Sequence, residues 1–164
     1  MKSIVQRVYN RLLRPVLPWK IGVCNGVAVR RHKLFDRHII SQDYEQTAVS
    51  AIQSLVRSGD HVVIIGGGEG VTAVWAAFRC GESGHVDVYE AVEETADRVR
   101  DTVALAGVEP IVSIHVEAVS ANTRLPECDV LEIDCEGCEV EVLPTLTIDP
   151  RATIVEHHVT IEAK

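Results

Sequence analysis

The chain has 164 residues, of which 46% are apolar, so it can build one domain around a sizeable core. Its formal net charge of −8 argues against nucleic acid as a partner, because phosphate binding needs clustered Lys and Arg. No apolar run approaches the roughly 20 residues that span a bilayer, so no membrane span is expected.

An N-terminal extension is expected over residues 1–42, before a main domain over 43–164. Residues 1–20 mix arginines with apolar residues and are interpreted as a packing helix or a loosely held terminus. A basic amphipathic helix that contacts a membrane surface or a partner is the alternative. Residues 21–31 predict a short hairpin that turns at Asn25-Gly26.

Helices and strands then alternate along the chain. A helix is predicted over 44–56, and β-favouring apolar runs predict strands at 61–65, 85–89, 111–116, 129–134 and 152–157. Helices are predicted at 71–80, 93–106 and 139–146, whereas 117–128 has a short helix at best. This alternation predicts an α/β fold, a doubly wound, mostly parallel Rossmann-like sheet with helices on both faces. The fold is expected to be C-terminally shortened, because no strands follow the fifth.

The most informative stretch runs from Val62 to Gly70, where four apolar residues lead into four glycines and one acid. It predicts a buried strand, a tight turn and the start of a helix, and glycines at such a turn let a ligand approach the backbone. Open α/β sheets bind ligands in the crevice at the carboxyl ends of their strands. A nucleotide-like cofactor is therefore expected here.

The glycine spacing argues against a dinucleotide. In a dinucleotide fingerprint, Gly66 and Gly68 would be followed by Gly or Ala at position 71, where this chain has Val71. Glu69 would repel a pyrophosphate and fits better with a cofactor that carries an amine, or with capping of the next helix. Glu90 ends the next strand, where an acid can accept both hydroxyls of a ribose, in NAD and nucleoside sites alike.

These motifs resemble those of the class I S-adenosylmethionine-dependent methyltransferases, which have a strand, Gly-x-Gly-x-Gly and a helix, and an acid ending the second strand. Within that superfamily the chain is most similar to the FkbM-type branch, through the run DCEGCE at 134–139. AVS at 118–120 and EHH at 156–158 match two further segments of that branch, and the resemblance covers roughly 43–158. The superfamily's usual acid before the glycines is Ile64 here.

The resemblance implies S-adenosylmethionine as the cofactor and a set of residues that would bind it. The set is Gly66, Gly68, Glu69, Gly70, Glu90, Glu117, Ala118 and Asp134. The glycines would lie under the amino-acid portion of the cofactor, Glu90 would hold the ribose, and Glu117 with Ala118 would flank the adenine.

Methyl transfer from a sulfonium needs mainly positioning, and a hydroxyl acceptor also needs a base that takes its proton. Asp134 is expected to bind the cofactor or orient the acceptor, with Glu136 beside it; either carboxylate could be the base if burial raised its pKa. Alternatively, Glu136 is only an acid at a helix N-terminus. His158 is a further acid–base candidate or acceptor contact, whereas His157 is expected to point to the opposite face.

The chain has five cysteines without framework-like spacing, which predicts free thiols, a reducing compartment and hence a cytoplasmic location. Cys135 and Cys138 form a C-x-x-C, a spacing that zinc sites use, with Cys128 as a further candidate ligand. A redox C-x-x-C is disfavoured, because it normally follows a first strand and begins a long helix. The preferred interpretation is that both cysteines are small apolar groups and that no metal binds.

The sequence thus predicts an S-adenosylmethionine-dependent methyltransferase, and the resemblance implies O-methylation of a small sugar, lipid or polyketide-like acceptor. A catalytically inactive cofactor-binding or partner-binding remnant is one alternative, favoured by the early end of the chain. A spermidine-synthase-like aminopropyltransferase is another, because its loop is similar to Gly-Gly-Gly-acid-Gly. A homodimer is also considered, since an unpaired sheet edge invites pairing.

Overall fold

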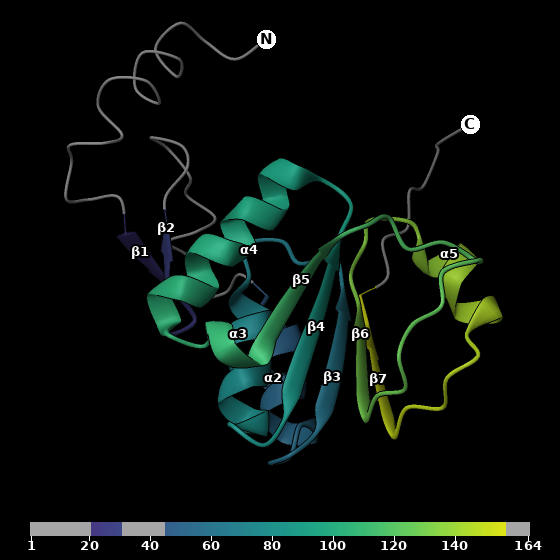
Figure 1. Ribbon diagram of the computed structural model, residues 1–164, viewed down its shortest axis with the longest axis horizontal. Coiled ribbons are helices and arrows are strands. Elements are labelled where there is room, and N and C mark those ends of the chain that lie inside the picture. Colours follow the sequence, from purple (N-terminus) through teal and green to yellow (C-terminus); the bar gives the residue numbers. More distant parts are fainter. Residues whose placement is uncertain (1–20, 31–44, 157–164) are drawn as a thin grey trace, which may run out of the picture.

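The computed structural model describes residues 21–30 and 45–156 (Figure 1). The helix expected over 1–20 lies outside the described residues, and so do His157 and His158. The predicted hairpin is confirmed: β1 (Ile21–Cys24) pairs antiparallel with β2 (Val27–Arg30). Its two turn residues have positive φ, as a two-residue hairpin turn requires.

The hairpin packs on the main domain. Cys24, Val27 and Val29 are buried in the same apolar cluster as the helices behind the sheet. The indole N–H of Trp75 donates a hydrogen bond of 2.9 Å to the carbonyl oxygen of Asn25 at the hairpin turn. The hairpin and the described part of the main domain therefore share one core.

The predicted alternation is also confirmed (Figure 1). The helices and strands are α2 (Gln46–Leu55), β3 (His61–Ile65), α3 (Val71–Cys80), β4 (His85–Glu90), α4 (Glu93–Ala106), β5 (Val112–Val116), β6 (Val130–Ile133), α5 (Glu139–Val142) and β7 (Ala152–Val155). Two short 3-10 helices are η4 (Glu109–Ile111) and η5 (Leu143–Thr145). Residues 117–128, which lack an apolar period, contain no helix.

The strands β3 to β7 form one five-stranded sheet in the order β5-β4-β3-β6-β7, and every neighbouring pair is parallel. Ile65 at the end of β3 pairs with Tyr89 of β4 and with Ile133 of β6. The three strands therefore end level with one another, and the loops that follow them meet at one edge. That edge is where a doubly wound sheet binds its ligands.

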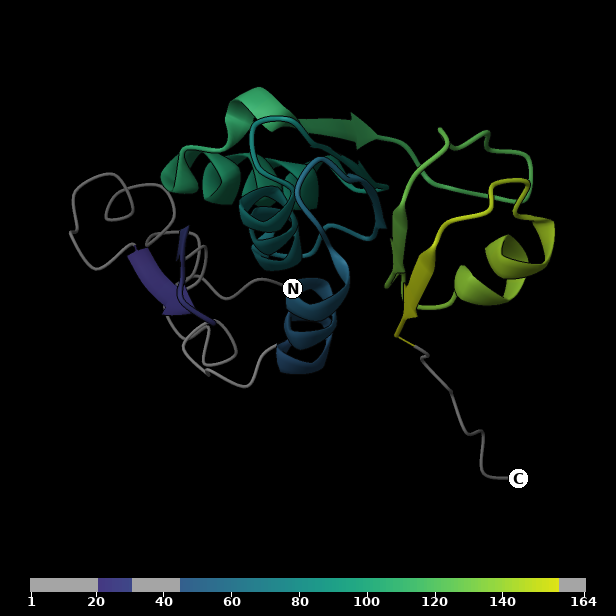
Figure 2. The same cartoon turned by 90° about the horizontal axis from the view of Figure 1, so that it is seen from below.

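Side-chain alternation sorts the strand residues into two apolar clusters. Val62 and Ile64 face α2, α3 and α4, whereas Val63 and Ile65 face the opposite side with Leu131. On that second side the sheet is covered by α5 and by the segment before β6, mainly over β6 and β7 (Figure 2). The helices thus cover the two faces unequally.

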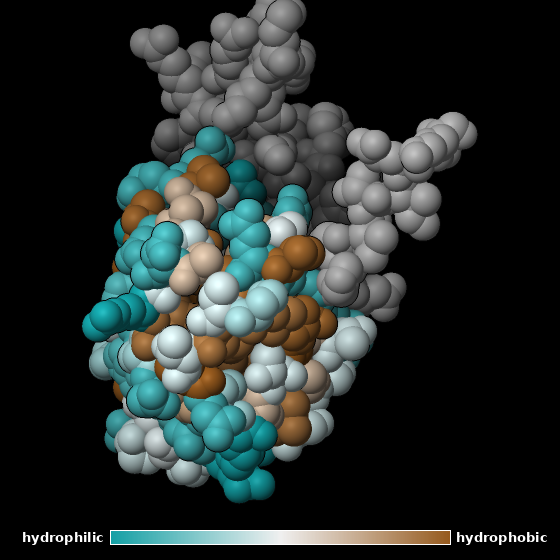
Figure 3. All heavy atoms as spheres, turned by 90° about the vertical axis from the view of Figure 1, so that its right-hand side faces the viewer, coloured by the Kyte–Doolittle hydropathy of each residue, from teal (hydrophilic) through white to brown (hydrophobic). Residues whose placement is uncertain are grey.

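In the part of the chain that the structure describes, β7 is an edge strand of the sheet, and apolar side chains are exposed on β7 and on the α5–η5 segment. Val140, Leu143 and Val155 are 67%, 38% and 38% exposed. Apolar residues gather on this side of the molecule (Figure 3). Among the described residues, no helix has the length and apolar character needed to cross a membrane.

Candidate functional site

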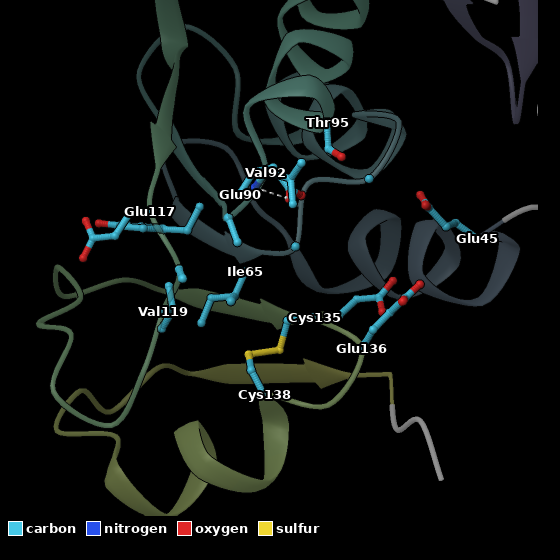
Figure 4. A pocket seen from close by; sticks show the side chains of 16 residues that line it. Glu45, Ile65, Glu90, Val92, Thr95, Glu117, Val119, Cys135, Glu136 and Cys138 are labelled. Carbon is cyan, nitrogen blue, oxygen red and sulfur yellow. Dashed lines mark hydrogen bonds between the residues drawn. A yellow bond between two sulfur atoms is a disulfide. The ribbon is translucent and has the colours of Figure 1, made fainter. Parts of the chain in front are cut away.

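The loops after β3, β4, β5 and β6 surround a cavity of about 410 Å³ at the carboxyl edge of the sheet (Figure 4). This volume lies in the range of small-molecule sites, roughly 300 to 1,000 Å³. The predicted site residues that line the cavity are Gly66, Gly68, Glu90, Glu117, Ala118, Asp134 and Glu136. Glu69 and Gly70 are not part of the lining, and His158 lies outside the described residues.

The packing around Gly66 explains why a glycine follows β3. Its φ is +96°, and a Cβ on it would lie 2.6 Å from the carbonyl carbon of Asp134. The loop backbone therefore packs directly on the end of β6. Two hydrogen bonds continue the ladder at this point: Gly66 N–H donates to Tyr89 O at 2.9 Å, and Asp134 N–H donates to Ile65 O at 2.8 Å. The absent side chain permits this close approach.

Glu90 is held firmly at the end of β4. The side chain is buried, and its carboxylate accepts hydrogen bonds from the backbone N–H groups of Gly67 and Val92, both at 3.1 Å. Each bond goes to a different carboxylate oxygen, and each such oxygen has a second lone pair. The fixed carboxylate can therefore accept further hydrogen bonds from two hydroxyls in the cavity.

Glu69 turns away from the cavity and towards α4. Its Oε1 accepts a hydrogen bond from Arg98 Nη1 at 3.0 Å, and the two side chains are 12% and 19% exposed. α3 begins after Gly70 (φ +80°) without a side-chain cap, and a Cβ on Gly70 would lie 3.0 Å from Val99 Cα. The helix cap expected of Glu69 is therefore absent, and its cofactor contact stays a prediction for a side chain outside the cavity lining. Glu69 and Gly70 fit the loop against α4.

Asp134 and Glu136 lie in the loop after β6 and line the cavity. Glu136 has φ +51°, which is uncommon for a residue with a side chain, and Gly137 follows with φ +123°. The N–H of Gly137 donates a hydrogen bond of 2.8 Å to the buried carboxylate of Glu139. The turn is therefore fixed on its α5 side, and the exposed Glu136 lies at the cavity rim.

Cys135 and Cys138 form a disulfide, and both line the cavity. The prediction of free thiols is therefore wrong for these two residues and holds for Cys24, Cys80 and Cys128. The expectation failed because spacing alone did not reveal the tight turn that brings their Cα atoms to 5.5 Å. With the two sulfurs bonded to each other, no thiolate is present at this C-x-x-C for zinc. Nor do the described residues contain another group of ligands arranged for a metal ion.

Glu132 is a buried acid for which the sequence analysis predicted no role. It lies on β6 in register with Ile64, the position at which the superfamily usually has its acid. Burial raises the pKa of Glu132 to about 8, and the negative charge of Glu45 adds to the rise, while the hydrogen bond with Thr72 opposes it. Within the described part of the chain, its Oε2 has no hydrogen-bond partner. Glu132 is therefore mainly a neutral carboxylic acid at pH 7.

A polar cluster supports Tyr89, another residue of the cavity wall. The Tyr89 ring stacks on His115 with 4.6 Å between ring centroids. His115 and His61 are hydrogen-bonded to the two oxygens of the Asp87 carboxylate, at 2.6 and 2.7 Å. Burial alone would raise the pKa of Asp87, but the two hydrogen bonds outweigh it, and the pKa is lowered. The ionised Asp87 therefore holds His115 in place beneath the ring of Tyr89.

Several residues that were not predicted as site residues also line the cavity. Val92 and Thr95 follow Glu90 closely in the chain, so their distance from the end of β4 could have indicated them. Glu45 directly precedes α2 and faces the same cavity from the opposite side (Figure 4). No local pattern signals Glu45, because only the packing of α2 on the sheet brings it to the site.

No family model and no curated protein matches the chain. The chain is similar to a SAM-dependent O-methyltransferase from Thermotoga maritima, with 28% identity, 57% of this chain and 36% of that chain covered, and a TM-score of 0.53. It is similar to an O-methyltransferase from Bacillus cereus in complex with SAH (22% identity, 61% and 47% covered, TM-score 0.46). A tRNA methyltransferase from Aquifex aeolicus also matches (18% identity, 57% and 37% covered, TM-score 0.49).

The chain has a Rossmann-like methyltransferase fold. This assignment rests on the Thermotoga maritima structure, which has the highest TM-score of the three. The chain spans less than half the length of each of these proteins, since it covers 36%, 47% and 37% of them. The FkbM-type resemblance stays a prediction.

Proposed function

We propose that the chain binds S-adenosylmethionine in the cavity and catalyses methyl transfer to an oxygen atom of a small-molecule acceptor. The observation that carries the proposal is the convergence of Gly66, Glu90 and Asp134 on one cavity, from the ends of three adjacent parallel strands. The similarity to the Thermotoga maritima O-methyltransferase supports it. The run DCEGCE at 134–139 favours the FkbM-type branch.

The residues present fit such a cofactor. The backbone at Gly66 and Gly68 is open to the cavity, as close approach of the amino-acid portion requires. Glu90 retains acceptor capacity for the two ribose hydroxyls. Val92 and Val119 offer apolar surface to the adenine, beside the backbone of Ala118. When bound, S-adenosylmethionine supplies a methyl group that is already activated on a sulfonium.

The chain's own residues would then orient the reactants and handle a proton. Asp134, at the end of β6, would orient the cofactor or the acceptor. Glu136, which is exposed at the rim and so lacks the burial expected of the base, would contact the acceptor hydroxyl. Both residues line the cavity, which supports a shared role towards the acceptor. His158 remains a predicted second acid–base group.

Calorimetry with S-adenosylmethionine, S-adenosylhomocysteine and NAD tests the proposal. We expect binding of the first two and no binding of NAD. Binding of NAD alone would overturn it. A methyl-transfer assay with a panel of small hydroxyl compounds then separates an enzyme from a binding protein, because the inactive alternative predicts binding without methylated product. Decarboxylated cofactor with a diamine tests aminopropyl transfer.

The proposal also covers partners and location. The net charge of −8 favours a small-molecule acceptor over nucleic acid. Because one similar structure is a tRNA methyltransferase, the acceptor panel should include RNA. The edge position of β7 among the described strands, together with its exposed Val155, favours a homodimer, which light scattering tests. A cytoplasmic location stays a prediction, and the disulfide removes two of the five free thiols that supported it.

A further inference from the structure

A disulfide lies in the wall of the proposed cofactor cavity. It joins Cys135 and Cys138 across the turn after β6, and both residues are partly exposed (Figure 4). Asp134 precedes the bridge, and Glu136 lies within it. All four residues line the cavity. The bridge thus encloses one of the two carboxylates assigned to the acceptor and adjoins the other.

One residue inside the bridge, Glu136, has a backbone conformation that is unfavourable for a residue with a side chain. Glu136 and Gly137, the two residues between the cysteines, both have positive φ, at 51° and 123°. A glutamate persists in the left-handed region only where its surroundings over-determine it. The bridge adds such a constraint to the Gly137–Glu139 hydrogen bond, because it fixes the two ends of the turn with their Cα atoms 5.5 Å apart. Opening the bridge would remove one of the two restraints on this turn.

The other cysteines differ in ways that confine thiol chemistry to this pair. Cys24 and Cys80 are buried, and Cys128 lies outside the cavity lining. Burial raises the pKa of Cys24 and of Cys128 to about 11, and nearby carboxylates add to both rises. Their thiols are therefore protonated at neutral pH, and a protonated thiol is a poor nucleophile.

We propose that Cys135 and Cys138 form a reversible thiol–disulfide site, and that its oxidation state sets the affinity of the cavity for the cofactor. The expected exchange partners are thiols and disulfides of the glutathione class. The exchange itself is independent of the proposed function, whereas its coupling to affinity rests on that function.

The exchange balances with oxidised glutathione as the oxidant. One protein thiolate attacks a sulfur of glutathione disulfide, which forms a mixed disulfide and releases one glutathione thiolate. The second protein thiolate attacks the protein sulfur of that mixed disulfide, which closes the Cys135–Cys138 bond and releases the second glutathione. Two electrons pass from the protein to glutathione disulfide, and the two thiol protons end on the two glutathiones. Reduction is the reverse.

The coupling must act in both directions. If oxidation raises the affinity for S-adenosylhomocysteine by some factor, then S-adenosylhomocysteine must favour the disulfide over the dithiol by the same factor. Coupling between two sites is typically about 5-fold to 150-fold. We expect oxidation to tighten binding by at least about 5-fold, because the bridge fixes the turn after β6, and Asp134, the proposed cofactor contact in the wall, directly precedes that turn.

The test uses the full chain in glutathione buffers of graded redox ratio. Alkylation followed by peptide mass spectrometry measures the fraction of Cys135–Cys138 disulfide, with and without saturating S-adenosylhomocysteine. Calorimetry measures the affinity for S-adenosylhomocysteine in the fully oxidised and fully reduced protein. We expect a disulfide that forms and opens without denaturant, and a ligand-induced shift in its equilibrium equal to the affinity ratio.

Matched variants remove ambiguity. The double variant Cys135→Ser, Cys138→Ser should bind with the affinity of the reduced protein and ignore the redox ratio. Cys128→Ser, which removes a thiol outside the lining, should keep the full redox response. Circular dichroism verifies that each variant is folded, and the wild-type titration stands without them.

Three results decide the proposal. A bridge that is absent, or that opens only in denaturant, overturns the exchange site. Equal affinities of the oxidised and reduced proteins overturn the coupling. If neither form binds S-adenosylhomocysteine, the proposed function and the coupling fail together, while the titration without ligand still decides whether the exchange site exists.

Discussion

Replacing Glu132 with glutamine should change the way stability depends on pH. Glu132 is 2% exposed, and burial raises its pKa from 4.5 to about 8. Because the folded-state pKa is raised, the folded protein holds one more proton than the unfolded chain between about pH 4.5 and 8. The free energy of unfolding therefore falls as pH rises through this interval. At about 1.4 kcal/mol per pH unit, the loss approaches about 5 kcal/mol above pH 8.

Glutamine has nearly the same shape and cannot ionise. The variant Glu132→Gln should therefore lose this pH dependence, and the buried amide should cost about 1 to 3 kcal/mol at pH 5, where the native carboxyl is neutral. At pH 8.5 the wild type has lost the stability that depends on the protonated Glu132, whereas the variant has not. The free energy of unfolding of the variant minus that of the wild type should therefore be about 3 to 5 kcal/mol higher at pH 8.5 than at pH 5.

Urea unfolding followed by circular dichroism, repeated from pH 5 to pH 8.5, measures this difference. Glu82→Gln is the control, because Glu82 is exposed in the turn after α3. Its stability curve should run parallel to that of the wild type. If the Glu132→Gln curve is also parallel to the wild type, the carboxyl ionises without penalty and the reasoning is refuted.

Three further predictions concern the loops and the sheet. Gly66→Ala should destabilise the protein by several kcal/mol more than Gly81→Ala in thermal melts, because both have positive φ but only a Cβ at position 66 would meet other backbone, that of Asp134 after β6. Asp87→Asn should lower stability by about 1 to 3 kcal/mol at pH 7. Since the pKa of Asp87 is lowered, this contribution is present above its unfolded value near 3.8 and is lost as pH falls. If Asp87→Asn and the wild type lose stability equally as the pH falls, this prediction is contradicted. Glu90→Gln should weaken S-adenosylhomocysteine binding by about 10-fold or more in calorimetry, since a charge-assisted hydrogen bond contributes about 1.5 to 3 kcal/mol.

Much of the fold could be predicted because the signals are local. The ranges predicted for α3 and α4 agree with the structure to the residue, since capping glycines and apolar periods mark both helices. β6 is shorter than predicted at both ends, because Asp129 and Asp134 lie just outside its pairing. The convergence of the glycine loop, Glu90 and Asp134 was also predictable, because parallel strands end at one edge.

The direction of single side chains in the loops was not predictable. Glu69 lies among glycines and was expected at the cofactor, yet it pairs with Arg98, which is 29 residues away in the chain. The same limit applies to Glu45, which reaches the cavity only through the packing of α2. Loop side chains follow the partners that surround them in space, and no period in the sequence encodes those partners.

The sequence by itself determined the order of strands and helices along the chain and the position of the glycine loop at the carboxyl edge of the sheet. These follow from periodicity, from glycine and from the topology rules of parallel sheets. Only the tertiary structure decided which residues face the cavity, that Glu132 is buried as an acid, and that Cys135 is bonded to Cys138. Each of these depends on distances between atoms across a turn or between elements, which the chain fixes only when it is fully packed.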